Sequence, residues 1–148
     1  FDLSFFFQGS YGNDIYNASR MFPEGMFDSR NQSDRVLMRW RNPGDYTTVP
    51  RAEKDKYPAI SSRFVEDGSY FKLKNVKLSY TLPRPLTRKA LMDRVTVYIS
   101  GDNLVTFTNY RGYDPEVNIG GGSSSAMGID QGVFPHARTY ILGATIVF

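Results

Sequence analysis

Four segments of the chain alternate between hydrophobic and polar residues with a period of two, which predicts four β-strands. We expect these strands over residues 1–12, 69–82, 94–110 and 138–148. In the last of them, one face is apolar up to the final side chain, whereas domains in water usually end in frayed polar residues. That apolar face consists of Tyr140, Leu142, Ala144, Ile146 and Phe148.

The second segment changes phase in its middle. Phe71 and Leu73 occupy odd positions, whereas Val76, Leu78 and Tyr80 occupy even ones. A single inserted residue would bring both halves onto one face, since a β-bulge adds one residue to one strand of a pair. The pattern therefore predicts a bulge near residues 74–75.

The connections between the segments differ greatly in length. Residues 13–68 and 111–137 form two long loops, and residues 83–93 form one short turn. Alternate connections of an antiparallel sheet lie on opposite sides, so both long loops fall on one side. Short periplasmic turns opposite long extracellular loops are typical of outer-membrane barrels.

Aromatic residues add to this pattern, because they make up 15% of the chain and gather near the strand ends. Tyr11, Phe107 and Tyr140 fall on the long-loop side, and Tyr80 and Phe148 on the short-turn side. Girdles of this kind mark the two interfaces of a bilayer. We therefore predict an all-β fold, a segment of a transmembrane antiparallel β-barrel with long extracellular loops.

Four strands cannot close a barrel, because the smallest need about 8. The chain also opens in the middle of a pattern, at Phe1, so we expect it to be the tail of something longer. The alternative is a secreted β-sandwich that binds carbohydrate through exposed aromatic side chains. A soluble monomer of residues 1–148 that unfolds cooperatively would favour the sandwich.

Three stretches carry a family resemblance, and they follow one another in order. They are GSYFKLKNVKLSYTLP (68–83), SGDNLVTFTNYRGYDPEVN (100–118) and FPHARTYILGATIVF (134–148). Together they resemble the C-terminal end of SusC/RagA-type TonB-dependent transporters of Bacteroidota. FFFQGSYGNDIYN (5–17) and RWRNPGD (39–45) are similar to family segments further upstream.

The resemblance implies the last four strands of a barrel of about 22 strands with a plugged lumen, in the cell outer membrane. Such a protein imports glycans or peptides with energy relayed by the TonB complex, and a SusD-like surface lipoprotein covers its mouth. Further implied partners are the remaining barrel and plug, outer-membrane lipid and the barrel-assembly machinery. From the resemblance we expect the plug domain and the TonB-contacting segment to lie outside this chain. The apolar face of the last strand resembles the signal that the assembly machinery recognises.

The composition argues against several kinds of chemistry. A single histidine and no cysteine give no basis for a metal site or a catalytic triad. A net charge of +3 gives no case for nucleic acid. GGGSSS (120–125) lacks the Lys-Ser/Thr of a phosphate loop and is interpreted as flexible linker. We therefore predict no enzyme activity and no cofactor.

Five loop residues are candidates for contact with substrate or lid, namely Arg39, Trp40, Arg41, Asp114 and Glu116. Trp40 has helical spacing with Val36 and Leu37, which predicts a short loop helix. Trp40 either stacks on a sugar or packs against the lid, or it only anchors this helix. We favour the anchoring role, because a motif shared with the family at large does not select one substrate. The two acids flank a proline, and we favour a turn-forming role for Asp114 over an acid and base pair.

Overall fold

The computed structural model describes residues 1–116, 119 and 127–148, so the glycine-serine run lies outside the described residues. The chain divides into two compact units. The sheet unit contains Phe1–Tyr11, Ser69–Thr108 and His136–Phe148, and the loop unit contains Gly12–Gly68 and Asn109–Pro135. In the described part of the chain, no helix combines the length and the hydropathy needed to cross a membrane.

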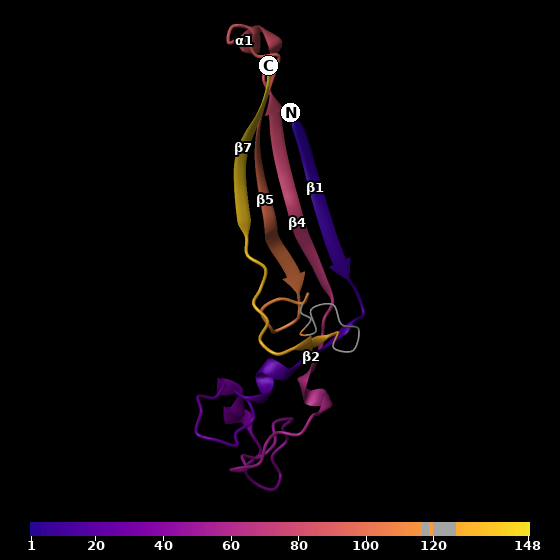
Figure 1. Cartoon of the computed structure of the whole chain (residues 1–148). Helices are drawn as coiled ribbons and strands as arrows, with labels where there is room; N and C mark the ends of the chain where they lie inside the picture. Colours follow the sequence, from indigo (N-terminus) through magenta and orange to yellow (C-terminus); the bar gives the residue numbers. More distant parts are fainter. Residues whose placement is uncertain (117–118, 120–126) are drawn as a thin grey trace. The chain divides into compact units, whose positions relative to one another are not determined.

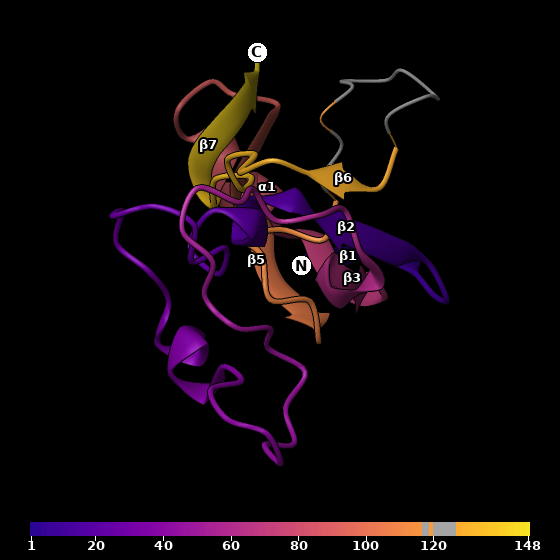
Figure 2. The same cartoon turned by 90° about the horizontal axis from the view of Figure 1, so that it is seen from below.

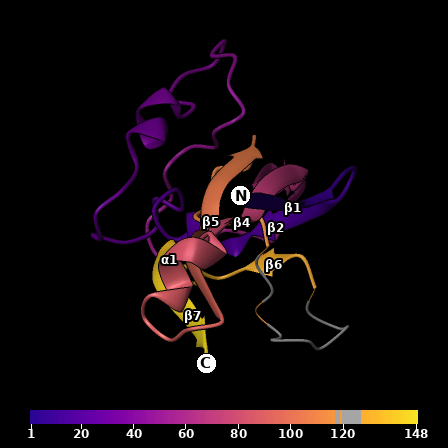
Figure 3. The same ribbon diagram turned by 90° about the horizontal axis from the view of Figure 1, so that it is seen from above.

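The sheet unit is one antiparallel sheet of four long strands in the order β1-β4-β5-β7 (Figure 1). The strands are β1 (Asp2–Ser10), β4 (Tyr70–Thr81), β5 (Arg94–Thr108) and β7 (Thr139–Val147). A short helix, α1 (Arg84–Arg88), lies between β4 and β5, at the end of the sheet where the chain terminates (Figures 1 and 3). The prediction of a mainly β structure is confirmed.

The predicted bulge is present. Along β1 the partners pass from Phe6↔Asn75 to Phe7↔Leu73, so Lys74 is left over. The register with β5 shifts at the same place, between Leu73 and Asn75. The shift reverses the phase of β4, and for this reason residues at odd positions before Lys74 share a face with residues at even positions after it.

One face of the sheet is apolar across all four strands. Residues directly opposite each other in an antiparallel pair point to the same side. Leu3 pairs with Leu78, Leu78 with Ile99, and Ile99 with Leu142, so one apolar row crosses the whole sheet. Ile99 is 51% exposed and Leu142 is 81% exposed. The apolar face as a whole contains Leu3, Phe5, Phe7, Phe71, Leu73, Val76, Leu78, Tyr80, Val95, Val97, Ile99, Val105, Phe107, Tyr140, Leu142, Ala144 and Ile146.

The opposite face is largely polar. Asn75 Nδ2 donates to Asp102 Oδ1 at 2.6 Å, and Lys77 Nζ lies 4.6 Å from the centroid of the Tyr98 ring. Tyr98 lies over Gly143, where an added Cβ would come within 2.5 Å of the ring. Gly143 therefore gives the ring room to lie flat along the polar face.

Aromatic pairs lie at both ends of the β1–β4 ladder on the apolar face. Phe1 stacks on Tyr80 with ring centroids 4.4 Å apart, and Phe7 stacks on Phe71 at 5.2 Å. Stacked pairs of this kind contribute about 0.5–1.5 kcal/mol beyond the area that they bury. The stacked rings on the apolar face thus stabilise the β1–β4 pairing near both of its ends.

The loop unit holds secondary structure that, apart from the loop helix near Val36 and Leu37, the sequence did not indicate. A small sheet has the order β3-β2-β6 (Figure 2). Its strands are β2 (Asp14–Asn17), β3 (Val65–Asp67) and β6 (Ile129–Asp130), and the 3₁₀ helices are η1 (Ala18–Met21), η2 (Asp34–Met38) and η3 (Ser62–Phe64). Elements this short show no readable periodicity. The two stretches predicted as separate loops are joined here, because β6 pairs with β2.

Candidate functional site

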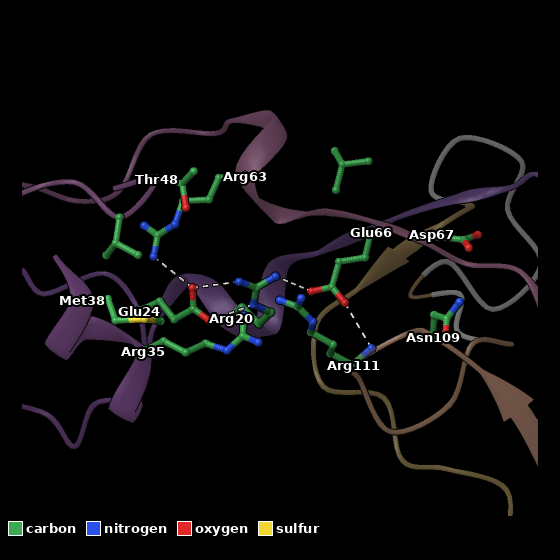
Figure 4. A pocket seen from close by; sticks show the side chains of 12 residues that line it. Arg20, Glu24, Arg35, Met38, Thr48, Arg63, Glu66, Asp67, Asn109 and Arg111 are labelled. Atoms are coloured by element: carbon green, nitrogen blue, oxygen red, sulfur yellow. Dashed lines mark hydrogen bonds and ion pairs between the residues drawn. The ribbon is translucent and has the colours of Figure 1, made fainter. Parts of the chain in front are cut away.

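The loop unit contains a buried carboxylate, that of Glu24. Glu24 is only 3% exposed, and Arg20 binds both of its oxygens, with Nε at 2.8 Å and Nη2 at 2.9 Å. Arg63 Nη2 donates to Glu24 Oε2 at 2.9 Å, and Arg35 Nη1 lies 4.0 Å from Oε1 (Figure 4). With Glu66, described next, these residues form the arginine–glutamate cluster.

Glu66 extends the cluster from β3. Its Oε1 accepts from Arg20 Nη1, and its Oε2 accepts from the backbone N–H of Arg111 at 3.1 Å. The pairing of β3 with β2, which sets Ile15 opposite Glu66, brings this carboxylate close to η1. Arg20 is thereby held between two carboxylates that lie 42 positions apart in the sequence.

An aromatic ring supports the cations. Phe64 is 1% exposed and packs with Ala18 and Met21. The guanidinium carbons of Arg63 and Arg20 lie 5.3 and 5.9 Å from its ring centroid. Cations over an aromatic face gain about 0.5–2 kcal/mol, so the ring fixes two arginines against the same carboxylate.

The ionisation of the cluster follows from this geometry. Burial alone would raise the pKa of Glu24, but the hydrogen bonds and charge of Arg20, with Arg63 and Arg35, bring the pKa below its ordinary value of 4.5. The hydrogen bond to Glu24 is the main cause that raises the pKa of Arg20. Glu24 and Arg20 therefore stay charged at neutral pH.

A cavity of about 540 Å³ lies beside the cluster, entirely within the loop unit (Figure 4). Two of its lining residues, Glu24 and Val49, are buried, and half of the lining is exposed, namely Met38, Thr48, Val65, Asp67, Asn109 and Arg111. Guanidinium groups bind carboxylates with two parallel hydrogen bonds, which makes an arginine-lined cavity a candidate anion site. It is lined by Arg20, Glu24, Arg35, Met38, Thr48, Val49, Arg63, Val65, Glu66, Asp67, Asn109 and Arg111.

A buried tyrosine holds the segment that carries Arg111. The Tyr110 hydroxyl donates to Asp130 Oδ2, and Asp130 Oδ1 accepts from the N–H groups of Gly132 and Val133 at 2.8 and 3.2 Å. Burial raises the pKa of Tyr110, and the Asp130 carboxylate raises it further, so the hydroxyl remains a donor. This bond fixes the backbone next to Arg111.

The predicted contact residues Arg39, Trp40 and Arg41 lie outside this cavity. The 3₁₀ helix η2 ends at Met38, so the predicted loop helix includes Val36 and Leu37 but stops before Trp40. Trp40 is half-buried, and its backbone N–H donates to Val49 O at 2.9 Å. The two arginines donate to η2 carbonyls, at 3.3 and 3.1 Å. These contacts support an anchoring role, and contact with substrate or lid stays a prediction.

Asp114 and Glu116 also lie outside the cavity. Asp114 is 6% exposed, and its Oδ1 accepts from the backbone N–H of Glu116 at 3.1 Å. This is the turn geometry that aspartate commonly stabilises, and it supports the turn-forming interpretation. Sequence reasoning missed Arg20, Glu24 and Glu66. Arg20 and Glu24 have the i and i+4 spacing of an ion pair, which is a weak local signal, and Glu66 belongs to no such pair with them.

Four of the five residues of the predicted assembly signal share one face of β7. In the β5–β7 register these four residues pair, in order, with Gly101, Ile99, Val97 and Val95 of β5. Phe148 follows the end of β7 and is 87% exposed. The signal role itself stays a prediction. The four strand residues are Tyr140, Leu142, Ala144 and Ile146.

Comparison with known proteins places the chain among receptors. It is 37% identical to TonB-dependent receptor P3 of Formosa agariphila, over 100% of this chain and 15% of the receptor. It is 27% identical to TonB-dependent receptor SusC of Bacteroides thetaiotaomicron, over 100% of this chain and 14% of that receptor. No protein-family model matches the chain.

Solved structures agree with the sequence relatives. The RagAB peptide importer in its closed-closed state superposes with a TM-score of 0.79 at 26% identity, covering 97% of this chain and 15% of that one. Its open-open state gives the same score over 99% of this chain and 15% of that one. None of these relatives is named as an enzyme.

The antiparallel sheet and these similarities together define a class, the TonB-dependent receptors of the outer membrane. The chain belongs to the SusC/RagA type of that class and corresponds to its C-terminal part, as the sequence resemblance predicted. It spans about 15% of the length of the relatives that it matches.

Proposed function

We propose that this chain forms the last four strands of a plugged barrel of about 22 strands, which imports glycans or peptides across the outer membrane. The import is driven by the TonB complex and shared with a SusD-like lipoprotein that covers the outer mouth. The names of the relatives support this proposal, since one is SusC and another is a peptide importer.

One observation carries the proposal, namely the exposed apolar face that crosses the sheet from Leu3 to Leu142. Exposure of such an apolar surface to water costs free energy, whereas contact with lipid tails removes that cost. A β-sandwich would bury it under a second sheet, and the described residues of the sheet unit supply only the four strands. The edge strands β1 and β7 each have one neighbour there, and further barrel strands would satisfy their outer edges.

The ends of the sheet fit the two bilayer interfaces. β7 has 9 residues and β5 has 15, which meets the length of about 9–11 that a tilted transmembrane strand needs. The stacked rings of Phe1 with Tyr80 and of Phe7 with Phe71 lie where aromatic girdles are expected. In this arrangement α1 belongs to the periplasmic side, the loop unit to the extracellular side, and the polar face to the lumen.

Import can be tested in cells that carry or lack the gene of the full-length receptor. We expect deletion to abolish uptake of a labelled oligopeptide or of a labelled oligosaccharide, and a protonophore to do the same in intact cells. Either class of solute would identify the substrate. Unchanged uptake of both classes after deletion would contradict an importer role.

Removal of Phe148 should affect assembly. Because Phe148 follows directly on the apolar face of β7 and is 87% exposed, we expect its deletion to lower the amount of receptor in the outer membrane several-fold. Uptake per assembled molecule should change much less. Heat-modifiable mobility of outer-membrane fractions measures the assembled amount, and equal amounts of deleted and intact receptor would refute a role in assembly.

A further inference from the structure

The cavity beside the arginine–glutamate cluster is lined by more arginines than carboxylates. Arg20, Arg35, Arg63 and Arg111 line it with Glu24, Glu66 and Asp67 (Figure 4). We propose that this cavity binds a carboxylate group of the imported substrate. The inference rests on the proposed import function and adds a chemical class to the substrate, one that bears negative charge.

The guanidinium groups of this cavity have donors to offer. An arginine side chain carries five N–H donors. Arg20 uses three of them on Glu24 and Glu66, whereas Arg63 gives one to Glu24. Arg35 lies 4.0 Å from Glu24, which is beyond hydrogen-bond distance. Among the described residues, Arg35 and Arg63 therefore retain donors that can reach a ligand.

The electrostatic balance of the cavity also favours an added anion. Burial lowers the pKa of Arg63, and the charges of Arg20 and Arg35 lower it further against the opposing attraction of Glu24. Together, the cavity lining carries four arginines against three carboxylates, a formal excess of one positive charge. A ligand carboxylate would supply the missing negative charge with bidentate geometry.

The shape of the cavity suits a ligand that enters from outside. Its volume of about 540 Å³ falls in the range of about 300–1,000 Å³ that is usual for small-molecule sites. The side chains of Arg20 and Arg63 are 15% and 18% exposed, whereas that of Arg35 is 37% exposed. A carboxylate would meet Arg35 first and then reach the deeper arginine Arg63. It could belong to an acidic peptide or to a uronic-acid sugar.

The test is equilibrium binding by calorimetry to the purified full-length receptor with four probes. These are tetraglutamate and tetraglutamine peptides, and trigalacturonate and galactotriose. We expect at least one acidic probe to bind more tightly than its neutral counterpart, with an affinity that falls as salt is added. Arg35→Gln should weaken binding of that probe about tenfold. Arg35→Lys should give an intermediate affinity, because lysine keeps the charge but lacks the two parallel N–H donors of a guanidinium.

Arg30→Gln provides the matched control. Arg30 belongs to the same unit, is 64% exposed and pairs with Asp28 outside the cavity, so its loss should leave the dissociation constant unchanged. If Arg35→Gln disturbs the loop unit, Arg111→Gln gives the same readout, since Arg111 is tied to Glu66 through its backbone.

Each outcome is decisive. Binding of the peptide alone or of the sugar acid alone supports the site and identifies the source of the carboxylate. Acidic probes that bind no better than neutral ones, or whose binding ignores both arginine substitutions, overturn it. A receptor that still imports its solute in that case retains the proposed function, so failure of this inference is separable from failure of import.

Discussion

Replacement of Leu142 by arginine in the full-length receptor is expected to reduce strongly the amount of protein assembled in the outer membrane. Leu142 lies near the middle of β7, pairs with Ile99 and is 81% exposed on the apolar face. If that face meets lipid, a charge at the bilayer midplane costs about 2–4 kcal/mol. Quantification of folded receptor in outer-membrane fractions measures the loss.

The residue next to it supplies the control. Ile141 is also apolar and 41% exposed, but it pairs with Ser100 on the polar face. Ile141→Arg should therefore be tolerated if that face borders an aqueous lumen. Equal loss from both substitutions would show that the two faces do not differ in environment, which is incompatible with a membrane wall.

Replacement of Glu24 by glutamine is expected to open the loop unit. Glu24 is 3% exposed and neutralises Arg20 and Arg63 directly. Removing one partner of a buried ion pair costs about 3–5 kcal/mol, since the remaining charges are left without compensation. At the lower limit, amide hydrogen exchange of residues 12–68 should become at least about 100-fold faster, which mass spectrometry of the purified receptor can measure.

Acid should reproduce part of this effect in the unmodified receptor. The pKa of Glu24 is lower in the folded unit than its ordinary value of 4.5, so its stabilising contribution is complete above about pH 4.5. That contribution is lost as pH falls from there through the folded-state pKa. Glu24→Gln should show a weaker acid dependence.

A partly exposed carboxylate of the same loop, Glu53, serves as the control for both experiments. Glu53 is bound by Arg51 and Lys56, whose side chains are 65% and 72% exposed. Surface pairs of this kind contribute little to stability, so Glu53→Gln should leave exchange unchanged. Faster amide exchange in Glu53→Gln, or no acceleration of exchange in Glu24→Gln, would argue against a special role of Glu24 in stabilising the loop unit.

The sheet could be predicted from local pattern because side chains alternate strictly along a strand. The same rule located the bulge at Lys74, where the alternation of β4 changes phase. Most of the loop unit escaped prediction, since strands such as β3, with 3 residues, and β6, with 2, are too short to show a period. Trp40, the single tryptophan, was a predicted contact residue, but in the structure its backbone N–H donates a hydrogen bond to Val49 O within the loop.

By itself, the sequence determined the two faces of the sheet, the bulge and the apolar last strand, because each depends on neighbours a few positions apart. It also determined the class of receptor through the motifs between Gly68 and Phe148. Only the tertiary structure decided the arginine–glutamate cluster. Arg63 lies 39 positions from Glu24, and Glu66 lies 46 positions from Arg20. Charges that far apart meet only when β2 and β3 pair, and no local pattern records that pairing.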